Sequence, residues 1–334
     1  MSSPGIRLVD YASEAVQRGD AIDRATAIAL GNLEGADARH LWQSADQLRA
    51  RTRGELLHTC SIVNAKAGGC SEDCAFCSQA ARYHTEAPRH QLLPLEQLLA
   101  AGAAAQQAGA QRFGMVIAER GLREDQVDPL VAATTAMKET TSLGVDGSLG
   151  LVSLQHLEEL RQAGMECLNH NLESSERFFP QVCTTHTFEE RVENIKRIHK
   201  AGMASCVGGI LGMGESVEDR VDLALAVRAL DVSRVPVNIL NPIPGTPFGD
   251  RQVLDAPTVK TSIAVWRLLL PQATIFVAGG RERAFGHDQG QALTSGADGL
   301  MIGDYLTTRG TPGTAIRSVA EGLGRSWRPL HGPV

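Results

Sequence analysis

This 334-residue chain has no long apolar run, no surplus of basic residues and no even set of cysteines. No apolar run reaches the roughly 18 residues that span a bilayer, so we expect no membrane association. The net charge of −6 and the absence of a basic patch or RNA-binding signature argue against a nucleic-acid partner. The opening segment also has no apolar stretch typical of a signal peptide, so we expect a cytoplasmic, reducing location.

Short β-like runs alternate with longer helical runs along most of the chain. Residues 1–55 read as helices, and we treat 56–320 as one domain and 321–334 as a tail. The predicted strands are His58–Lys66, Arg112–Ala118, Leu143–Ser148, Glu166–Asn171, Ala204–Leu211, Val235–Leu240, Thr274–Ala278 and Gly299–Ile302. Eight strands alternating with helices predict an α/β fold, a (β/α)8 TIM-type barrel with an N-terminal helical extension. A doubly wound open sheet is the alternative.

The most informative motif is the C-x3-C-x2-C spacing of Cys70, Cys74 and Cys77. Three thiolates cannot complete a structural zinc site, which takes four protein ligands. They can hold three irons of a [4Fe–4S] cluster and leave the fourth iron open for a substrate or cofactor. Radical S-adenosylmethionine enzymes hold their cofactor in this way. A disulfide framework is disfavoured because the chain is long and its seven cysteines are an odd number.

Further candidates for contacts with S-adenosylmethionine lie near the cysteine motif and after the fifth predicted strand. Gly208 and Gly209 permit close approach of a ligand to the backbone, and the Glu215 carboxylate is suited to accept hydrogen bonds from ribose hydroxyls. Phe76 precedes the last cysteine and has an apolar face suited to an adenine ring. The alternatives are a tight turn at the glycines and loop packing for the phenylalanine.

Polar residues also occur at the end of one predicted strand and inside another strand that is otherwise apolar. Asn169, Asn171 and Glu173 close the fourth predicted strand and are typical of polar ligand recognition, although a turn before a helix would also account for them. Asn238 lies inside the apolar run Val235–Leu240, where a buried amide needs a partner. Arg281 follows two glycines and is expected to meet an anion or a cluster, unless it forms a surface salt bridge.

Four cysteines lie outside the motif. Cys167 is interpreted as a buried apolar filler. Cys60 and Cys206 fall in predicted strands and can both face the barrel interior below the first cluster, because alternate strand residues share a face. Cys183 lies before a predicted helix, near the expected mouth of the barrel.

Taken together, these segments resemble biotin synthase, a family of radical S-adenosylmethionine enzymes. The resemblance runs from about Cys60 to Thr307. It is carried by Ser61–Gly68, the cysteine motif, Asn169–Glu173, Thr184–Arg191, Cys206–Gly209 and Val277–Glu282.

The resemblance implies an enzyme that converts dethiobiotin to biotin. A [4Fe–4S] cluster on Cys70, Cys74 and Cys77 would cleave S-adenosylmethionine, and a second, auxiliary cluster would supply the sulfur. Asn169 and Glu173 are then assigned to the cofactor, and Asn171 and Asn238 to the substrate. The family also implies an electron donor such as flavodoxin or ferredoxin and a homodimer.

The auxiliary site departs from the family pattern. Cys206 and Arg281 match two of its four usual ligands, but Gly114 and Asp146 stand where the family has cysteines. Glycine offers no side-chain ligand, so we predict a rearranged auxiliary cluster held by Cys60, Cys183 and Cys206.

Two other functions stay open. One is radical chemistry without sulfur insertion, like that of hydrogenase maturases or amino-acid mutases, which the missing cysteines favour. The other is a non-catalytic iron–sulfur or zinc-binding protein, which would not bind S-adenosylmethionine.

Overall fold

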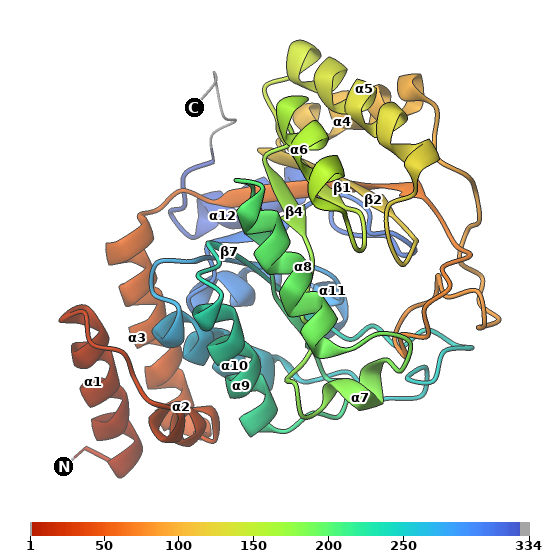
Figure 1. Cartoon of the computed structure of the whole chain (residues 1–334). Coiled ribbons are helices and arrows are strands. Elements are labelled where there is room, and N and C mark those ends of the chain that lie inside the picture. The colour runs from red at the N-terminus through yellow and green to blue at the C-terminus, as the bar shows by residue number, and fades with distance from the viewer. Residues whose placement is uncertain (1, 328–334) are drawn as a thin grey trace.

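The computed structural model describes residues 2–327, in which one parallel sheet forms the centre of the molecule (Figure 1). Its strands are β1 (His58–Lys66), β2 (Arg112–Ile117), β3 (Gly144–Ser148), β4 (Cys167–Asn169), β5 (Ala204–Cys206), β6 (Gly209–Leu211), β7 (Arg234–Ile239), β8 (Thr274–Val277) and β9 (Gly299–Met301). They run in the order β5-β4-β3-β2-β1-β9-β8-β7-β6. An additional pairing of β5 with β7 closes the sheet into a barrel.

The barrel has eight strand positions, because β5 and β6 are two halves of one strand. We predicted a continuous strand over Ala204–Leu211, and that prediction is wrong at its middle. Pro236 on β7 faces this break and has no N–H to donate to the ladder. A Cβ on Gly208 would also lie 1.9 Å from the Pro236 carbonyl oxygen, so the chain bends past the proline. The predicted (β/α)8 barrel is confirmed, and the open-sheet alternative is wrong.

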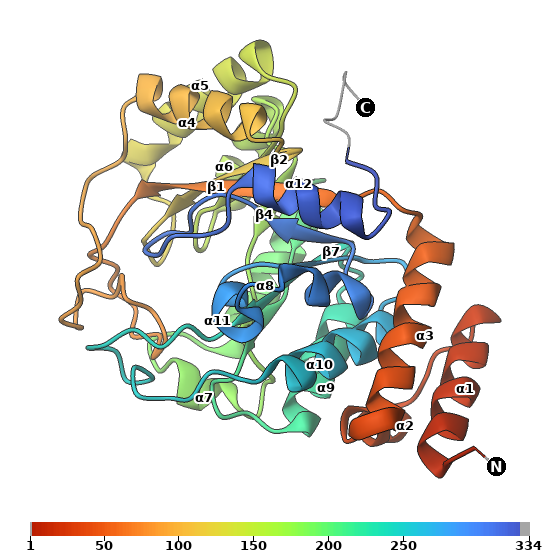
Figure 2. The same cartoon turned by 180° about the vertical axis from the view of Figure 1, so that it is seen from behind.

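Helices surround the barrel on the outside (Figures 1 and 2). They are α4 (Leu95–Gln107), α5 (Glu124–Thr140), α6 (Leu154–Gln162), α7 (Phe179–Val182), α8 (Phe188–Lys200), α9 (Val217–Ala229), α10 (Ala256–Leu269), α11 (Arg281–Phe285) and α12 (Gly313–Gly322), with a 3-10 turn at Gln289–Thr294. Side-chain caps fix where several of these helices begin. Thr187 caps α8 and Ser216 caps α9, each in a reciprocal box with an acidic residue three positions on.

The N-terminal extension consists of α1 (Pro4–Gln17), α2 (Arg24–Gly31) and α3 (Gly35–Arg53), which lie together at one side of the barrel (Figure 2). Helix α3 packs on α10, and the buried Arg267 of α10 forms an ion pair with the buried Asp298. The boundaries that we set at 55/56 and 320/321 stay predictions, and residues 328–334 of the proposed tail lie outside the described residues. Within residues 2–327, no helix is long and apolar enough to span a bilayer.

Candidate functional site

The cysteine motif lies in the loop that follows β1, at the carboxyl ends of the strands. Gly68 and Gly69 have φ angles of +67° and +73°, which turn the chain over the barrel mouth. Cys70, Cys74 and Cys77 all line one cavity of about 180 Å³ there, which we call the mouth cavity. The structure therefore brings the three thiols together in the arrangement that an open-iron cluster requires.

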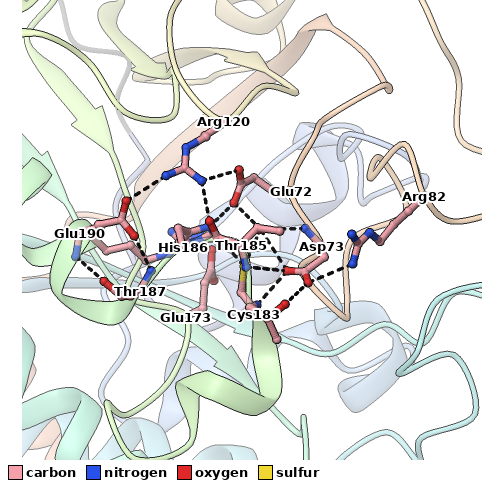
Figure 3. Close-up of polar contacts among 12 residues, drawn as sticks. Glu72, Asp73, Arg82, Arg120, Glu173, Cys183, Thr185, His186, Thr187 and Glu190 are labelled. Carbon is pink, nitrogen blue, oxygen red and sulfur yellow. Dashed lines mark hydrogen bonds and ion pairs between the residues drawn. The ribbon is translucent and has the colours of Figure 1, made fainter.

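Two acidic residues between the cysteines tie this loop to the segment before α8 (Figure 3). Asp73 accepts hydrogen bonds from the backbone of Thr184 at 2.9 Å and of Thr185 at 3.2 Å. Glu72 accepts from the Thr185 hydroxyl at 2.6 Å and contacts His186 closely. These bonds hold the pKa of both carboxyls below the usual range, although burial opposes the shift. The cysteine loop is therefore anchored by charged-group hydrogen bonds between Cys70 and Cys74.

Cys183 belongs to this anchor rather than to the barrel interior. Its sulfur lies 3.1 Å from Asp73 Oδ1 and 3.2 Å from His186 Nδ1. A hydrogen bond with Cys74 raises the pKa of Cys74 and lowers that of Cys183 to about 4. The grouping of Cys183 with Cys60 and Cys206 is therefore wrong in this structure. The segment after the short helix α7 folds back over the cysteine loop, which sequence spacing does not reveal.

The end of β4 also lines the mouth cavity. Asn169, Asn171 and Glu173 all face it, with Arg191 of α8 beside them. Glu173 adopts a left-handed φ of +67°, and its carboxylate lies 3.8 Å from Arg191. Burial raises the pKa of Glu173, and its Oε2 atom has no hydrogen-bond partner among the described residues. A strained backbone that presents a buried, unpaired acceptor is typical of a ligand site.

Phe76 and Asn238 line one cavity beside the mouth cavity. Phe76 lines the mouth cavity and a neighbouring cavity that Asn238 also lines. Asn238 accepts a hydrogen bond from the Gly279 N–H at 3.0 Å and donates to the Gly209 carbonyl at 3.3 Å. The predicted need of this amide for partners is therefore met in part by the backbone.

Gly208, Gly209 and Glu215 stand apart from the described cavities. A Cβ on Gly209 would lie 2.4 Å from the Glu173 carbonyl oxygen, so this glycine lets β6 pack closely against the segment after β4. Glu215 accepts hydrogen bonds from Gly212 N at 2.8 Å and Arg220 Nε at 2.7 Å, while its Oε2 atom is buried without a partner. A contact between Glu215 and the ribose stays a prediction. The hydrogen bonds that Glu215 forms in the structure hold the loop before α9.

Replacement of Glu215 by alanine should therefore destabilise the protein. The Glu215 carboxylate is almost fully buried, and its loss leaves Arg220 without its ion-pair partner. Breaking a buried pair on one side costs about 3 kcal/mol or more. Denaturant unfolding should show this loss, with the exposed Glu193→Ala as the matched control. An unfolding free energy equal to that of the wild type would contradict the structural role.

A further cavity, of about 190 Å³, lies deeper in the barrel, and we call it the inner cavity. Cys60 of β1 and Cys206 at the end of β5 line it together with Gly114 and Asp146. It also shares Asn169 and Asn171 with the mouth cavity, so the two adjoin. Burial raises the pKa of Cys60 and of Cys206 to about 12. Both thiols would lose their protons on binding a metal, as ligand thiols do.

Arg281 is fully buried at the start of α11. Its guanidinium donates to the Met301 carbonyl at 2.7 Å, the Val277 carbonyl at 3.3 Å and Gln289 at 2.7 Å, and pairs with Glu282. It does not line the inner cavity. The positive charge of Arg281 lies near enough to Cys60 to favour the thiolate form of that cysteine. The place of Arg281 beside the auxiliary site stays a prediction.

Our sequence reasoning missed the residues that position the cysteine loop. Glu72 and Asp73 occupy the variable positions of the C-x3-C spacing, and Gln79 accepts hydrogen bonds from Asn64 and Gly68 N, both at 3.0 Å. The one available signal was the pair of carboxylates within a predicted loop. Their partners Thr184, Thr185 and His186 lie more than 100 positions along the chain, so spacing alone could not identify them.

Comparison with known proteins agrees with this geometry. A family model described as "Radical SAM superfamily" matches residues 66–227, and one described as "Biotin and Thiamin Synthesis associated domain" matches residues 236–325. The fold and the three-cysteine loop thus define a radical S-adenosylmethionine protein.

Curated relatives narrow the class. The chain is 42% identical over 323 residues to biotin synthase of Cyanothece sp., covering 95% of this chain and 87% of the relative. It is also 42% identical over 316 residues to biotin synthase of Desulforudis audaxviator, with 95% and 96% covered. The chain belongs to the biotin synthase family.

Solved structures agree on the fold. Methylornithine synthase superposes with a TM-score of 0.83 at 20% identity, covering 96% of this chain and 97% of that one. The FeFe-hydrogenase maturase HydG from Carboxydothermus hydrogenoformans gives 0.81 at 16%, covering 96% and 80%. At these identities the likeness extends to the fold alone.

Proposed function

We propose that this protein converts dethiobiotin to biotin by radical S-adenosylmethionine chemistry, with sulfur supplied from a second iron–sulfur cluster. Family membership supports the reaction. The observation that carries it in the structure is the alignment of two thiol-lined cavities along the barrel. The mouth cavity contains the three motif cysteines, and the adjoining inner cavity contains Cys60 and Cys206.

The mouth cavity fits a [4Fe–4S] cluster and S-adenosylmethionine. Cys70, Cys74 and Cys77 would hold the cluster, which when bound supplies the electron that cleaves S-adenosylmethionine. Glu72 and Asp73 fix the position of the loop. Glu173 offers its unpaired Oε2 atom to the amino group or ribose of the cofactor, and Phe76 offers an apolar face for the adenine.

The boundary between the two cavities suits the substrate. Asn169 and Asn171 line both cavities, and Asn238 of β7 also lines the inner one. Amide side chains can donate to and accept from a cyclic urea such as that of dethiobiotin. They would hold the reacting carbons between the adenosyl group and the sulfur donor, and the barrel wall would exclude water.

The inner cavity fits an auxiliary cluster held by Cys60 and Cys206. Asp146 is the third potential ligand on its wall, because carboxylates also bind iron. In this structure, however, Arg112 Nε donates to Asp146 Oδ2 at 2.8 Å. Cys183 is not part of this site, since its sulfur lies against Cys74, His186 and Asp73.

The second candidate is radical chemistry without sulfur insertion. The observation in its favour is that Gly114 and Asp146 bring no thiol to the inner cavity. Iron and sulfide counts on anaerobically prepared protein, combined with an assay of biotin from dethiobiotin, separate the two. We expect more than about four irons per chain and biotin formation. Four irons and no biotin would overturn the sulfur-insertion proposal.

The remaining assignments rest on the family resemblance. We propose a flavodoxin or ferredoxin as electron donor, a homodimer as the assembly and the cytoplasm as the location. Light scattering would test the assembly, and reduction of the bound cluster by purified flavodoxin would test the donor.

A further inference from the structure

Another cavity opens at the amino-terminal ends of the strands, opposite the cysteine loop. It has a volume of about 310 Å³, and we call it the basal cavity. Its wall comes from the end of α3 and the first residues of several strands. The residues are Arg53, Leu56, His58, Thr59, Cys60, Gln111, Arg112, Asp146, Cys206, Arg234, Thr274 and Phe276.

The charge of this wall is positive. Three guanidinium groups, those of Arg53, Arg112 and Arg234, face one carboxylate, that of Asp146. Arg112 forms a two-point ion pair with Asp146 and also donates to Glu166 at 3.0 Å, and Glu166 is itself paired with Lys138 at 2.8 Å. Burial lowers the pKa of His58, which keeps that ring neutral. Arg53 and Arg234 therefore supply the net charge of the cavity.

Each of these two arginines also has an unused donor. Arg53 Nε and Arg234 Nη1 are buried and have no hydrogen-bond partner among the described residues. The nearest carboxylate oxygens are 3.8 Å away, on Asp298, and 3.7 Å away, on Asp146, which is beyond hydrogen-bond range. Asp298 is already bound by Arg267 and by Ile275 N at 2.7 Å. Buried unpaired donors beside net positive charge are typical of an anion site.

The basal cavity adjoins the inner cavity. Cys60, Asp146, Cys206 and Phe276 line both, so the two cysteines are reached from the bottom of the barrel as well as from its mouth. This matters because a cluster that gives up sulfide to a product must be refilled before the next product forms. On the mouth side, the cofactor and the substrate would occupy the path.

We propose that the basal cavity binds hydrosulfide and admits it to the Cys60 and Cys206 site, where it replaces the sulfide lost to biotin. This inference rests on the proposed function. The step assigned to Arg53 and Arg234 is the capture and passage of a small inorganic anion. No covalent bond forms or breaks in it, and no electron is transferred.

Removal of the two charges should slow refilling. We would deplete the auxiliary sulfide by one turnover, add sodium sulfide and ferrous iron anaerobically, and follow the return of auxiliary-cluster absorbance. The variant Arg53→Gln/Arg234→Gln should refill roughly tenfold more slowly than the wild type, because focused positive charge raises the arrival rate of an anion. The exposed Arg317→Gln is the matched charge control, and Arg53→Lys/Arg234→Lys should recover most of the rate.

Bromide offers a test that does not depend on activity or on a bound cluster. Crystals of the wild type soaked in sodium bromide should show an anomalous peak beside Arg53 and Arg234, and the double glutamine variant should not. Bromide should also slow refilling of the wild type. A wild type that forms biotin but refills at a rate within about twofold of the variant would overturn the proposal and leave the proposed function intact. An empty basal cavity in the bromide crystals would overturn it as well.

Discussion

Replacement of Cys74 by alanine should abolish the cleavage of S-adenosylmethionine to 5′-deoxyadenosine. Cys74 lines the mouth cavity with Cys70 and Cys77, and the loss of one of three thiolates leaves two irons of the cluster without a protein ligand. We expect anaerobically prepared Cys74→Ala to lose about four irons per chain and all cleavage activity. Iron analysis and chromatography of 5′-deoxyadenosine measure both.

The matched control is Cys167→Ala. Cys167 is a fully buried thiol on β4 that lines none of the cavities described above, so this variant should keep its iron and its cleavage rate. Cleavage at the wild-type rate in Cys74→Ala would contradict the assignment of the motif.

Replacement of Cys60 or Cys206 by serine should separate the cleavage of S-adenosylmethionine from the insertion of sulfur. Each variant should still cleave S-adenosylmethionine, since neither residue lines the mouth cavity. Each should lose the iron and absorbance of the auxiliary cluster and form no biotin, because a serine hydroxyl is a poor ligand for iron–sulfur clusters. Metal analysis, absorbance and product assays on the same preparation would show that cleavage is retained while biotin formation is lost.

Cys183→Ser is the control variant for Cys60→Ser and Cys206→Ser. Its sulfur lies in the anchor of the cysteine loop, so the auxiliary iron should stay bound in this variant. Loss of auxiliary iron in Cys183→Ser would contradict the placement seen here. Full biotin formation by Cys60→Ser would contradict the rearranged cluster.

The sequence predicted the framework well where one local signal decides the structure. The bounds of β1 agree with the prediction to the residue, because this strand is an uninterrupted run. Parallel strands also bring their carboxyl ends to one edge, so the loop after β1 and the end of β4 had to meet. For the same reason, the common cavity of Cys70, Asn169 and Glu173 follows from topology.

Features set by contacts distant in sequence could not be predicted in the same way. The break between β5 and β6 depends on Pro236, which lies on a different strand. The position of Cys183 depends on how the segment after α7 folds over Asp73. The basal cavity depends on arginines from α3, β2 and β7 that meet only when the barrel closes.

The small residue at position 114 bears on which ligand sets this barrel can accommodate. A Cβ built on Gly114 would touch only an Ile62 methyl at 3.3 Å and Asp146 Cβ and the Ser61 carbonyl at 4.0 Å. The scaffold can therefore accept a cysteine there with a shift of a few tenths of an ångström. A thiol at position 114 therefore needs no remodelling of β2. Together with Cys60 and Cys206, Gly114→Cys and Asp146→Cys would line the inner cavity with four thiols, so the ligand set of the sulfur donor can be exchanged on one scaffold.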